Sequence, residues 1–298
     1  MLRNFSDIHR KSSSQQKKRI AVAAAQDAGV LQAVYRAYQQ GIADAVLVGV
    51  AGKIRDILRE LAIPGDLFEI FPVDGDLAEQ SRDAVHLVTE GQADLIMKGQ
   101  VDTVILLKAI LSEPALRTGR IMSHVAVMQV AAYDKLLLPT DCGMNISPGL
   151  AQKQDILANA LEVARALEIN QPKVGIICAK EKVSPKMQDT LDAQALVELN
   201  QAGKLGDCIV GGPFALDNAI SPAAAKQKGI VHPVAGDADI LLMPNLVAGN
   251  IFYKTLVFLA EAENAGVIVG AKVPIVLTSR ADDEAAKLNS ISVAALMA

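Results

Sequence analysis

From Arg19 onward the chain alternates short apolar runs with amphipathic segments, and this alternation limits its possible folds more than any other feature. Residues 20–24 and 45–50 are continuous apolar runs, as in strands that are covered on both faces. Residues 29–39 and 53–61 instead repeat apolar side chains at the three-to-four spacing of a helix. Strands that alternate with helices need right-handed crossovers, so the pattern predicts an α/β fold with a parallel sheet and helices on both of its faces.

The same alternation continues almost to the end of the chain. Further strands are predicted at residues 68–72, 95–97, 136–138, 174–178, 208–210, 240–243, 267–269 and 275–277. Further helices are predicted at residues 78–90, 150–167 and 187–201, and one more opens at Gly249 and Asn250 and ends at Glu263. No Ser/Gly/Pro-rich linker separates two halves, so composition alone marks no domain boundary.

Composition and charge narrow the functional class. The 298 residues are 51% apolar but only 3% aromatic, which is typical of α/β enzymes. The net charge of −4 argues against a nucleic-acid partner, and no apolar run approaches the roughly 20 residues that cross a bilayer. Three widely spaced cysteines without a CxxC pair favour a reducing compartment. We therefore expect a cytoplasmic enzyme that acts on small molecules, with no nucleic-acid or membrane partner.

The start of the chain is the one basic region. Five basic residues frame a polar stretch there: Arg10, Lys11, Lys17, Lys18 and Arg19. This pattern favours a solvated N-terminal arm, with a targeting or helix-binding role as the alternative.

Polar groups at the ends of predicted strands are the candidate sites, because parallel sheets bind ligands at the carboxyl ends of their strands. The first group follows residues 95–97 and contains Lys98, Gly99 and Thr103. A glycine lets the backbone approach a ligand, and the following helix N-terminus offers free amides to an anion. The spacing supports equally well a plain strand-to-helix turn that is capped by Asp102 or Thr103.

A second group places Arg117 and Arg120 beside a hydroxyl and a glycine, just before His124. Guanidinium forks match the oxygens of phosphate or carboxylate, whereas a solvated loop is the alternative. His124 is a candidate general base, although a hydrogen-bonded structural role is favoured for a single histidine at the start of a strand.

A third group, at residues 140–148, combines the carboxylate of Asp141, the thiol of Cys142 and the amide of Asn145. These side chains at a strand end predict a ligand-binding edge. No histidine lies near Cys142 in the sequence to serve as its base, so a packed thiol is favoured over a nucleophile.

Two later groups follow the same rule. Asp217 and Asn218 come after a Gly-Gly-Pro segment, and Gly249, Asn250 and Lys254 lie where a strand gives way to a helix. The latter position suits an anion or a ribose, with Asn250 as an ordinary helix cap as the alternative.

The last group lies at residues 278–282 and contains Thr278, Ser279, Arg280 and Asp282. Arg280 presents a planar fork of donors that fits an oxyanion. Ser279 can stabilise a developing negative charge, and a nearby carboxylate can remove a proton. A capped helix start with an exposed Arg280 is the alternative.

Taken together and in this order, the motifs resemble the phosphate acetyl/butyryltransferase family. The resemblance extends over about residues 93–288 and rests on six segments, at residues 97–103, 117–119, 140–145, 212–219, 249–254 and 274–280. The ending Thr-Ser-Arg-Ala-Asp and the short length resemble phosphate butyryltransferases more than phosphate acetyltransferases.

This resemblance implies the reaction acyl-CoA + phosphate ⇌ acyl phosphate + CoA, with direct transfer in a ternary complex and no acyl-enzyme. CoA and phosphate would be substrates, with no permanently bound cofactor and no metal. It implies a fold similar to that of isocitrate and isopropylmalate dehydrogenases, with the active site between two α/β domains. We place these domains at residues 1–127 with 266–298 and at residues 128–265, and we expect a homo-oligomer.

The resemblance also assigns roles to residues. The serine and arginine of the family's C-terminal motif match Ser279 and Arg280, and Asp282 is chosen as the base. The acetyl branch has its catalytic aspartate at the spacing of Ala286 in this chain, where Asp282, Asp283 and Glu284 are the nearest carboxylates. We assign the following residues to substrate binding: Lys98, Gly99, Thr103, Arg117, Asp141, Cys142, Asn145, Asp217, Asn218, Gly249, Asn250, Lys254 and Thr278.

Four other functions are alternatives at this point. They are phosphate acetyltransfer from acetyl-CoA, a metal- and NAD-dependent β-decarboxylating dehydrogenase of the same fold, an acyltransferase that uses acyl carrier protein, and a non-catalytic ligand-binding module. The dehydrogenase would need a cluster of metal-binding aspartates, and the sequence contains no GxGxxG motif.

Overall fold

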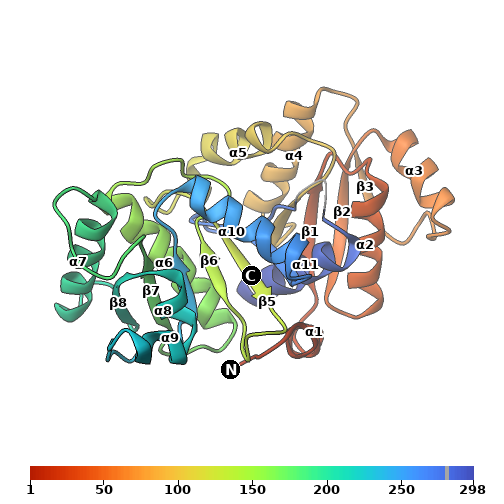
Figure 1. The fold of residues 1–298 in the computed structure, drawn as a ribbon. Coiled ribbons are helices and arrows are strands. Elements are labelled where there is room, and N and C mark those ends of the chain that lie inside the picture. Colours follow the sequence, from red (N-terminus) through yellow and green to blue (C-terminus); the bar gives the residue numbers. More distant parts are fainter. Residues whose placement is uncertain (279–281) are drawn as a thin grey trace. The chain divides into compact units, whose positions relative to one another are not determined.

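The computed structural model describes residues 1–278 and 282–298, and the chain divides into two compact units. We call residues 5–120 and 265–298 the terminal unit, and residues 1–4 and 121–264 the central unit. Each unit contains parallel strands with helices packed against them (Figure 1). The domain assignment made from the sequence stays a prediction.

The terminal unit orders its strands β3-β2-β1-β4-β11-β10. These strands are β1 (Lys18–Ala23), β2 (Ala43–Gly49), β3 (Glu69–Pro72), β4 (Leu95–Lys98), β10 (Glu263–Val269) and β11 (Ile275–Val276). Neighbours are parallel except β10 and β11, which are antiparallel. Since β11 pairs with β4, strands from the two ends of the chain share one sheet.

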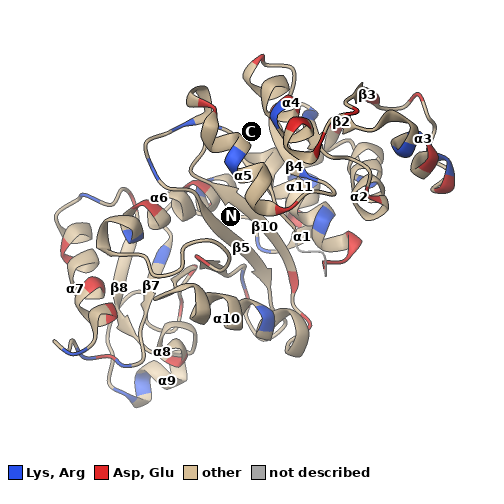
Figure 2. Cartoon of the chain, turned by 90° about the horizontal axis from the view of Figure 1, so that it is seen from above, with Lys and Arg blue, Asp and Glu red and all other residues tan. Residues whose placement is uncertain are grey.

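Two groups of helices pack on this sheet. The helices of the unit are α1 (Phe5–Ser13), α2 (Ala28–Gln39), α3 (Ala51–Glu60), α4 (Leu77–Thr89), α5 (Thr103–Ser112), the 3-10 helix η1 (Pro114–Leu116) and α11 (Glu284–Met297). α4 packs against β1, β2, β4 and α5, whereas α11 packs against α1, α2 and β11. Viewed from above, the sheet lies between these two groups (Figure 2).

The N-terminal segment is not the solvated arm that the sequence predicted. Residues 5–13 form α1, in which Phe5 is 1% exposed and Ile8 is 0% exposed. The helix packs on α11, and His9 shares a 2.8 Å hydrogen bond with Asn289. The prediction was wrong because it gave more weight to the surrounding basic residues than to the apolar side chains of Phe5 and Ile8, which have helical spacing.

The central unit orders its strands β5-β6-β9-β7-β8. They are β5 (Ser123–Gln129), β6 (Leu138–Thr140), β7 (Lys173–Ile177), β8 (Ile209–Phe214) and β9 (Ile240–Leu242). The helices are α6 (Leu150–Ala166), α7 (Gln188–Gln201), α8 (Leu216–Ile220), α9 (Pro222–Gln227) and α10 (Leu246–Leu259). β5 and β6 are antiparallel, and the other neighbouring strands are parallel.

Helix α10 begins earlier than the sequence indicated. Its N-cap is Asn245, whose side chain accepts a 3.0 Å hydrogen bond from the backbone N–H of Ala248. Gly249 and Asn250 consequently lie inside the helix and do not open it. Asn250 therefore does not act as the helix cap that was one reading of the sequence.

The strands form the buried core, as their apolar sequences require. Every residue of β4, β6 and β9 is buried, and the last four residues of β1 are buried as well. The predicted α/β class is confirmed. The two antiparallel pairs depart from the expected parallel arrangement, because a strand covered on both faces has the same apolar pattern in either direction.

Candidate active site

The segment after β4 lies close enough to the end of β1 for backbone hydrogen bonds to form between them. The N–H of Gly99 donates to the carbonyl of Ala23 at 2.9 Å, and the N–H of Gln100 donates to that of Ala24 at 2.7 Å. A Cβ added to Gly99 would lie 2.2 Å from the Ala24 carbonyl oxygen. Glycine is therefore required here by the approach of the segment that ends β1, whereas one of the two sequence interpretations had assigned it to the approach of a ligand.

Lys98 is buried, with 9% of its surface exposed. Its Nζ donates to the carbonyl oxygens of Gly99 at 3.2 Å and Val101 at 3.1 Å. The ammonium therefore fixes the loop between β4 and α5 from inside.

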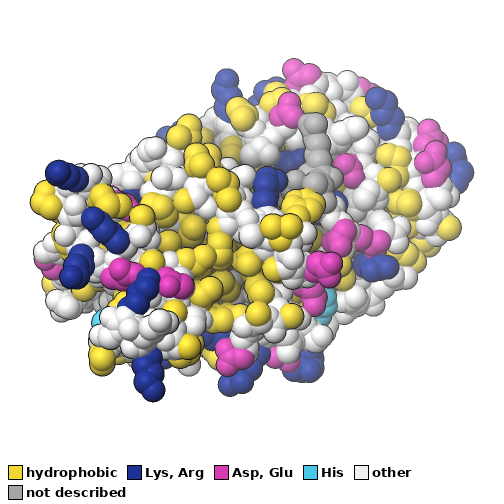
Figure 3. Space-filling view, in the orientation of Figure 1, with side chains coloured by type: hydrophobic (Ala, Val, Ile, Leu, Met, Phe, Trp, Pro, Cys, Tyr) yellow, Lys and Arg dark blue, Asp and Glu magenta, His cyan; other side chains and the backbone are white. Residues whose placement is uncertain are grey.

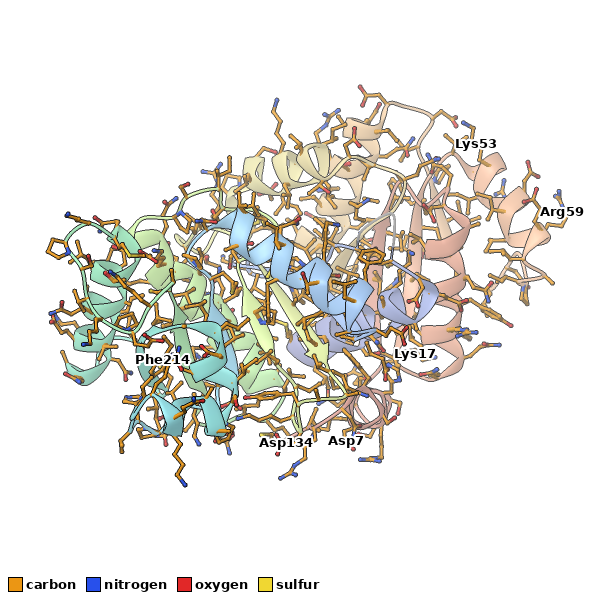
Figure 4. The ribbon with its side chains drawn as sticks, viewed as in Figure 1. Asp7, Lys17, Lys53, Arg59, Asp134 and Phe214 are labelled. Atoms are coloured by element: carbon orange, nitrogen blue, oxygen red, sulfur yellow. The ribbon has the colours of Figure 1, made fainter. Side chains whose placement is uncertain are left out.

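A cavity of about 890 Å³ adjoins this loop within the terminal unit. It is lined by the residues Gln26, Asp27, Val50, Lys53, Asp74, Gly75, Asp76, Leu77, Gln80, Lys98, Gly99, Gln100, Val101 and Asp102. Lys53 lines it from the first turn of α3, and Arg59 lies near the other end of the same helix (Figure 4). The cavity lies at the carboxyl ends of parallel strands, the position expected for a ligand site in such a sheet.

Three other predicted binding residues belong to the terminal unit but do not line this cavity. Thr103 is the first residue of α5. Arg117 follows η1, and its Nε donates to the carbonyl of Leu111 at 3.0 Å. Thr278 follows β11 and is 5% exposed.

The predicted catalytic residues follow β11 in the sequence. Ser279 and Arg280 lie outside the described residues. Asp282 precedes α11, and its carbonyl oxygen accepts a hydrogen bond from Nζ of Lys287. The N-cap of α11 is Asp283, which accepts a 2.8 Å hydrogen bond from the N–H of Ala286.

In the central unit, Asp141 organises the loop that follows β6. Its Oδ1 accepts from the N–H groups of Gly143 at 2.7 Å and Met144 at 3.0 Å. Its Oδ2 accepts from the backbone N–H of Asn145 at 3.1 Å and from Asn145 Nδ2 at 2.6 Å. Asn145 Nδ2 also donates to the carbonyl of Met122 at 3.0 Å. The structure therefore joins Asp141 and Asn145 in one rigid loop.

Helix α10 lies directly against this loop. A Cβ on Gly249 would lie 2.3 Å from the carbonyl oxygen of Asp141, so only glycine permits the approach. Asn250 Nδ2 donates to the carbonyl of Cys142 at 3.2 Å. The structure brings together Asp141, Cys142, Gly249 and Asn250, which the sequence had placed in two separate groups.

The Cys142 thiol is in the core of the central unit. The residue is 2% exposed and belongs to the apolar cluster that includes Met128, Phe214 and Leu241. Burial raises the pKa of this thiol far above its ordinary value, and the nearby Asp141 carboxylate raises it further. A thiol held in its neutral form is a poor nucleophile, as the sequence interpretation favoured.

His124 flanks the same loop. The residue is 8% exposed, and a Cβ on Gly143 would lie 3.2 Å from its ring. The ring meets Tyr253 of α10 edge-on, with 6.0 Å between the centroids. Tyr253 lies in the segment 249–254 on which the family resemblance rests, but it was not selected as a binding residue.

Asp217 and Asn218 belong to a separate polar cluster at the start of α8. Asn218 Nδ2 donates to Glu181 at 2.6 Å, and Lys228 pairs with Glu181 at 2.7 Å and with Asp217 at 3.1 Å. Hydrogen bonds from Lys228 and Asn218 lower the pKa of Glu181 to about 2. Glu181 was not selected from the sequence, where it lies between two lysines and resembles a solvated loop residue.

Lys254 is exposed on α10, and its Nζ lies 6.0 Å from the ring centroid of Phe258.

Within residues 1–278 and 282–298, no group of three or more His, Cys, Asp or Glu side chains is arranged to hold a metal ion. In the same residues, no helix has both the length and the apolar character that crossing a membrane requires.

Comparison with known proteins places these features in a family. The family model described as phosphate acetyl/butaryl transferase matches residues 4–80 and 72–295. The chain belongs to this family. The phosphate acetyl/butyryltransferase family that the sequence motifs predicted is thereby confirmed.

Relatives within the phosphate acetyl/butaryl transferase family match over nearly their whole length. A phosphate butyryltransferase of Clostridium acetobutylicum is 46% identical over 299 residues, covering 100% of this chain and 99% of the relative. A phosphate acetyltransferase of Thermotoga maritima is 46% identical over 282 residues, covering 94% and 95%. The crystal structure of a branched-chain phosphotransacylase from Enterococcus faecalis superposes with a TM-score of 0.83 at 33% identity, covering 94% and 98%.

Proposed function

We propose that this chain catalyses the reversible transfer of a short-chain acyl group, in the first place butyryl, between CoA and inorganic phosphate. The observation that carries the proposal is the similarity to a phosphate butyryltransferase along the full length of both chains. The order of the six segments, which resembles that of the family, also supports the proposal.

The chemistry follows from the C-terminal segment. When acyl phosphate is consumed, Asp282 takes the proton of the CoA thiol as sulfur attacks the acyl carbonyl. Ser279 donates a hydrogen bond to the oxyanion that forms, and the bond from the acyl carbon to the phosphate oxygen then breaks. Arg280 holds the phosphate as it leaves. In the opposite direction, phosphate attacks the thioester and the protonated Asp282 returns the proton to sulfur.

A chain-length series tests the proposal. Acetyl-, propionyl-, butyryl- and hexanoyl-CoA are supplied with phosphate, and release of free thiol is followed. We expect kcat/KM for butyryl-CoA to exceed that for acetyl-CoA by at least roughly 10-fold, because each methylene that fits an apolar pocket contributes about 1 kcal/mol or more. No thiol release with any of these substrates would refute the proposal.

Phosphate acetyltransfer is the second candidate. The Thermotoga maritima phosphate acetyltransferase matches this chain with the same 46% identity as the butyryltransferase, although over fewer residues. A kcat/KM that is highest for acetyl-CoA in the same series would assign the chain to this activity.

Replacing Cys142 by Ser is expected to leave most of the turnover intact, because the buried neutral thiol does not attack the acyl group in the proposed mechanism. The buried hydroxyl should lower the free energy of unfolding by roughly 1–3 kcal/mol. Thiol-release kinetics and urea unfolding measure the two effects, with Cys178→Ser as the matched buried control. An acyl adduct on Cys142 in the mass spectrum of a quenched reaction would contradict this expectation.

We further propose that the enzyme acts in the cytoplasm as a homo-oligomer and holds no permanent cofactor. Support for self-association comes from α10, where Val247, Ile251, Phe258 and Leu259 are 61–82% exposed. Figure 3 shows hydrophobic side chains gathered over this helix. Exposed apolar side chains that gather on a surface are typical of association sites.

A further inference from the structure

A cavity of about 750 Å³ lies within the central unit. Its lining includes Pro148, Lys153, Asp189, Asp192, Pro244 and Asn245. These residues belong to the segments that follow β6, β7 and β9, which the sheet order places side by side. Ligands of parallel sheets bind at the carboxyl ends of the strands, and a volume of this size is common for a small-molecule site.

Two opposite charges are buried in the wall of this cavity. Lys153, in the first turn of α6, and Asp192 of α7 are each 4% exposed, and Nζ of Lys153 lies 2.6 Å from Oδ2 of Asp192. Oδ1 of Asp192 accepts a 2.8 Å hydrogen bond from Nε2 of Gln188. Loss of hydration for two buried ions offsets most of their attraction, so stability alone does not explain the pair.

The ion pair leaves donors that a ligand can use. An ammonium has three N–H donors, and within the described residues only Asp192 accepts from Lys153. Asn245 uses Oδ1 to accept from the N–H of Ala248, and none of the same residues accepts from its Nδ2. Leu150, which also lines the cavity, is the first residue of α6 and adds the N–H groups of a helix start. Such a set of donors suits the oxygens of a phosphate group.

The rest of the wall has a different chemistry. Asp189, in the first turn of α7, contributes a carboxylate. Carboxylates bind ribose hydroxyls in nucleotide-binding α/β folds. Pro148 and Pro244 contribute apolar surface on which a planar base can lie. Inorganic phosphate alone fits less well, because it would leave the Asp189 carboxylate facing a second anion.

We propose that this cavity is a nucleotide-binding site, in which Lys153, Asn245 and the start of α6 hold a phosphate group. Asp189 accepts from the ribose, and the two prolines contact the base. The inference goes beyond the proposed function and does not depend on acyl transfer. A nucleoside phosphate can be a free nucleotide or the nucleotide end of CoA, and both share the chemistry that the cavity offers.

The first test measures binding of adenosine monophosphate (AMP) by calorimetry. Every sample carries Arg280→Ala, so that the residue assigned to the substrate phosphate cannot hold the probe. We expect Lys153→Gln to weaken AMP binding at least roughly 10-fold, because glutamine can still donate to Asp192 but a neutral donor holds phosphate less strongly than a charged one. No AMP binding by the Arg280→Ala chain would overturn the inference.

Lys135→Gln is the matched control. Lys135 forms an ion pair with Asp239 at 2.7 Å in the same unit, its side chain is 12% exposed, and it does not line this cavity. Its replacement removes the same charge and should leave AMP affinity unchanged. Equal AMP affinities of Lys153→Gln and Lys135→Gln would show that Lys153 does not hold the phosphate.

The second test needs no change at Lys153. Saturating AMP should slow amide hydrogen exchange in the peptides that span residues 149–153 and 187–192, because a bound ligand opposes local opening. The peptide that spans residues 5–13 of the terminal unit should not change. Unchanged exchange in both cavity peptides would overturn the inference even if Lys153→Gln does not fold.

Competition then identifies the source of the nucleotide. CoA that displaces AMP, and does so less well in Lys153→Gln, would show that the nucleotide end of CoA occupies the cavity. AMP that stays bound in the presence of CoA would show a site for a free nucleotide. Either result supports a nucleotide site. Inorganic phosphate that binds as tightly as AMP would overturn it, because the ribose and the base would then contribute nothing.

Discussion

Replacing Arg280 with Ala is expected to lower kcat about 1,000-fold and to raise the KM for phosphate, which is the scale seen when one cation that stabilises transferring phosphate or an oxyanion is removed. The planar guanidinium can hold two phosphate oxygens at once, and alanine leaves the developing charge without a partner. The kcat of Arg280→Lys should lie between that of the wild type and that of Arg280→Ala, because an ammonium keeps the charge but cannot hold two phosphate oxygens in the same planar fork. Steady-state kinetics of thiol release with varied phosphate measure both parameters.

Arg59→Ala is the matched control for this experiment. Arg59 carries the same charge on the surface of α3, where it pairs with Asp56 at 2.9 Å (Figure 4). Its loss should leave both parameters unchanged, so net charge alone cannot explain the effect. If Arg280→Ala retained kcat within about threefold of the wild type, the assignment of the phosphate-binding role would be wrong.

The second large effect is expected for Asp141→Ala. This change removes the acceptor of three backbone N–H groups and of Asn145 Nδ2, in a residue that is 3% exposed. Each donor that is left unsatisfied costs about 1 kcal/mol. The free energy of unfolding of the variant should therefore be roughly 3–4 kcal/mol lower than that of the wild type. Urea unfolding, followed by circular dichroism, measures this difference.

Asp155→Ala provides the control for Asp141→Ala. Asp155 lies in the same unit, and its Oδ2 accepts one 3.2 Å hydrogen bond, from the N–H of Ile121. Asp155→Ala should therefore lower the free energy of unfolding by about 1 kcal/mol or less. Equal unfolding midpoints for the two variants would show that the Asp141 carboxylate does not hold the loop together.

The sequence predicted most elements because two-sided burial leaves a strong signal. The strand predicted at residues 20–24 is found as Lys18–Ala23, and the helix predicted at residues 150–167 is found as Leu150–Ala166. Strand β8 was predicted too short, ending at Val210, because Gly211, Gly212 and Pro213 indicated a turn. The strand continues through them to Phe214, and it lies at an edge of the sheet order, where a proline breaks no essential ladder.

The sequence indicated groups of polar residues, but it did not indicate which of those groups lie together in the folded chain. The polar residues at 141–145 were selected as one group, and the structure joins Asp141 and Asn145 in one loop, but their internal hydrogen bonds depend on loop geometry that spacing does not reveal. The contact of Gly249 with the Asp141 carbonyl joins segments more than 100 positions apart, and no local pattern indicates it.

The pairing of β11 with β4 also bears on how the protein is made. The ribosome releases residues 5–120 before it synthesises β11, so one edge of β4 stays unpaired until β11 is available. The central unit's sequence is by then fully translated and is free to fold first. An unpaired strand edge can pair with another chain, so a product that stops before Ile275 would expose the edge of β4 that β11 covers.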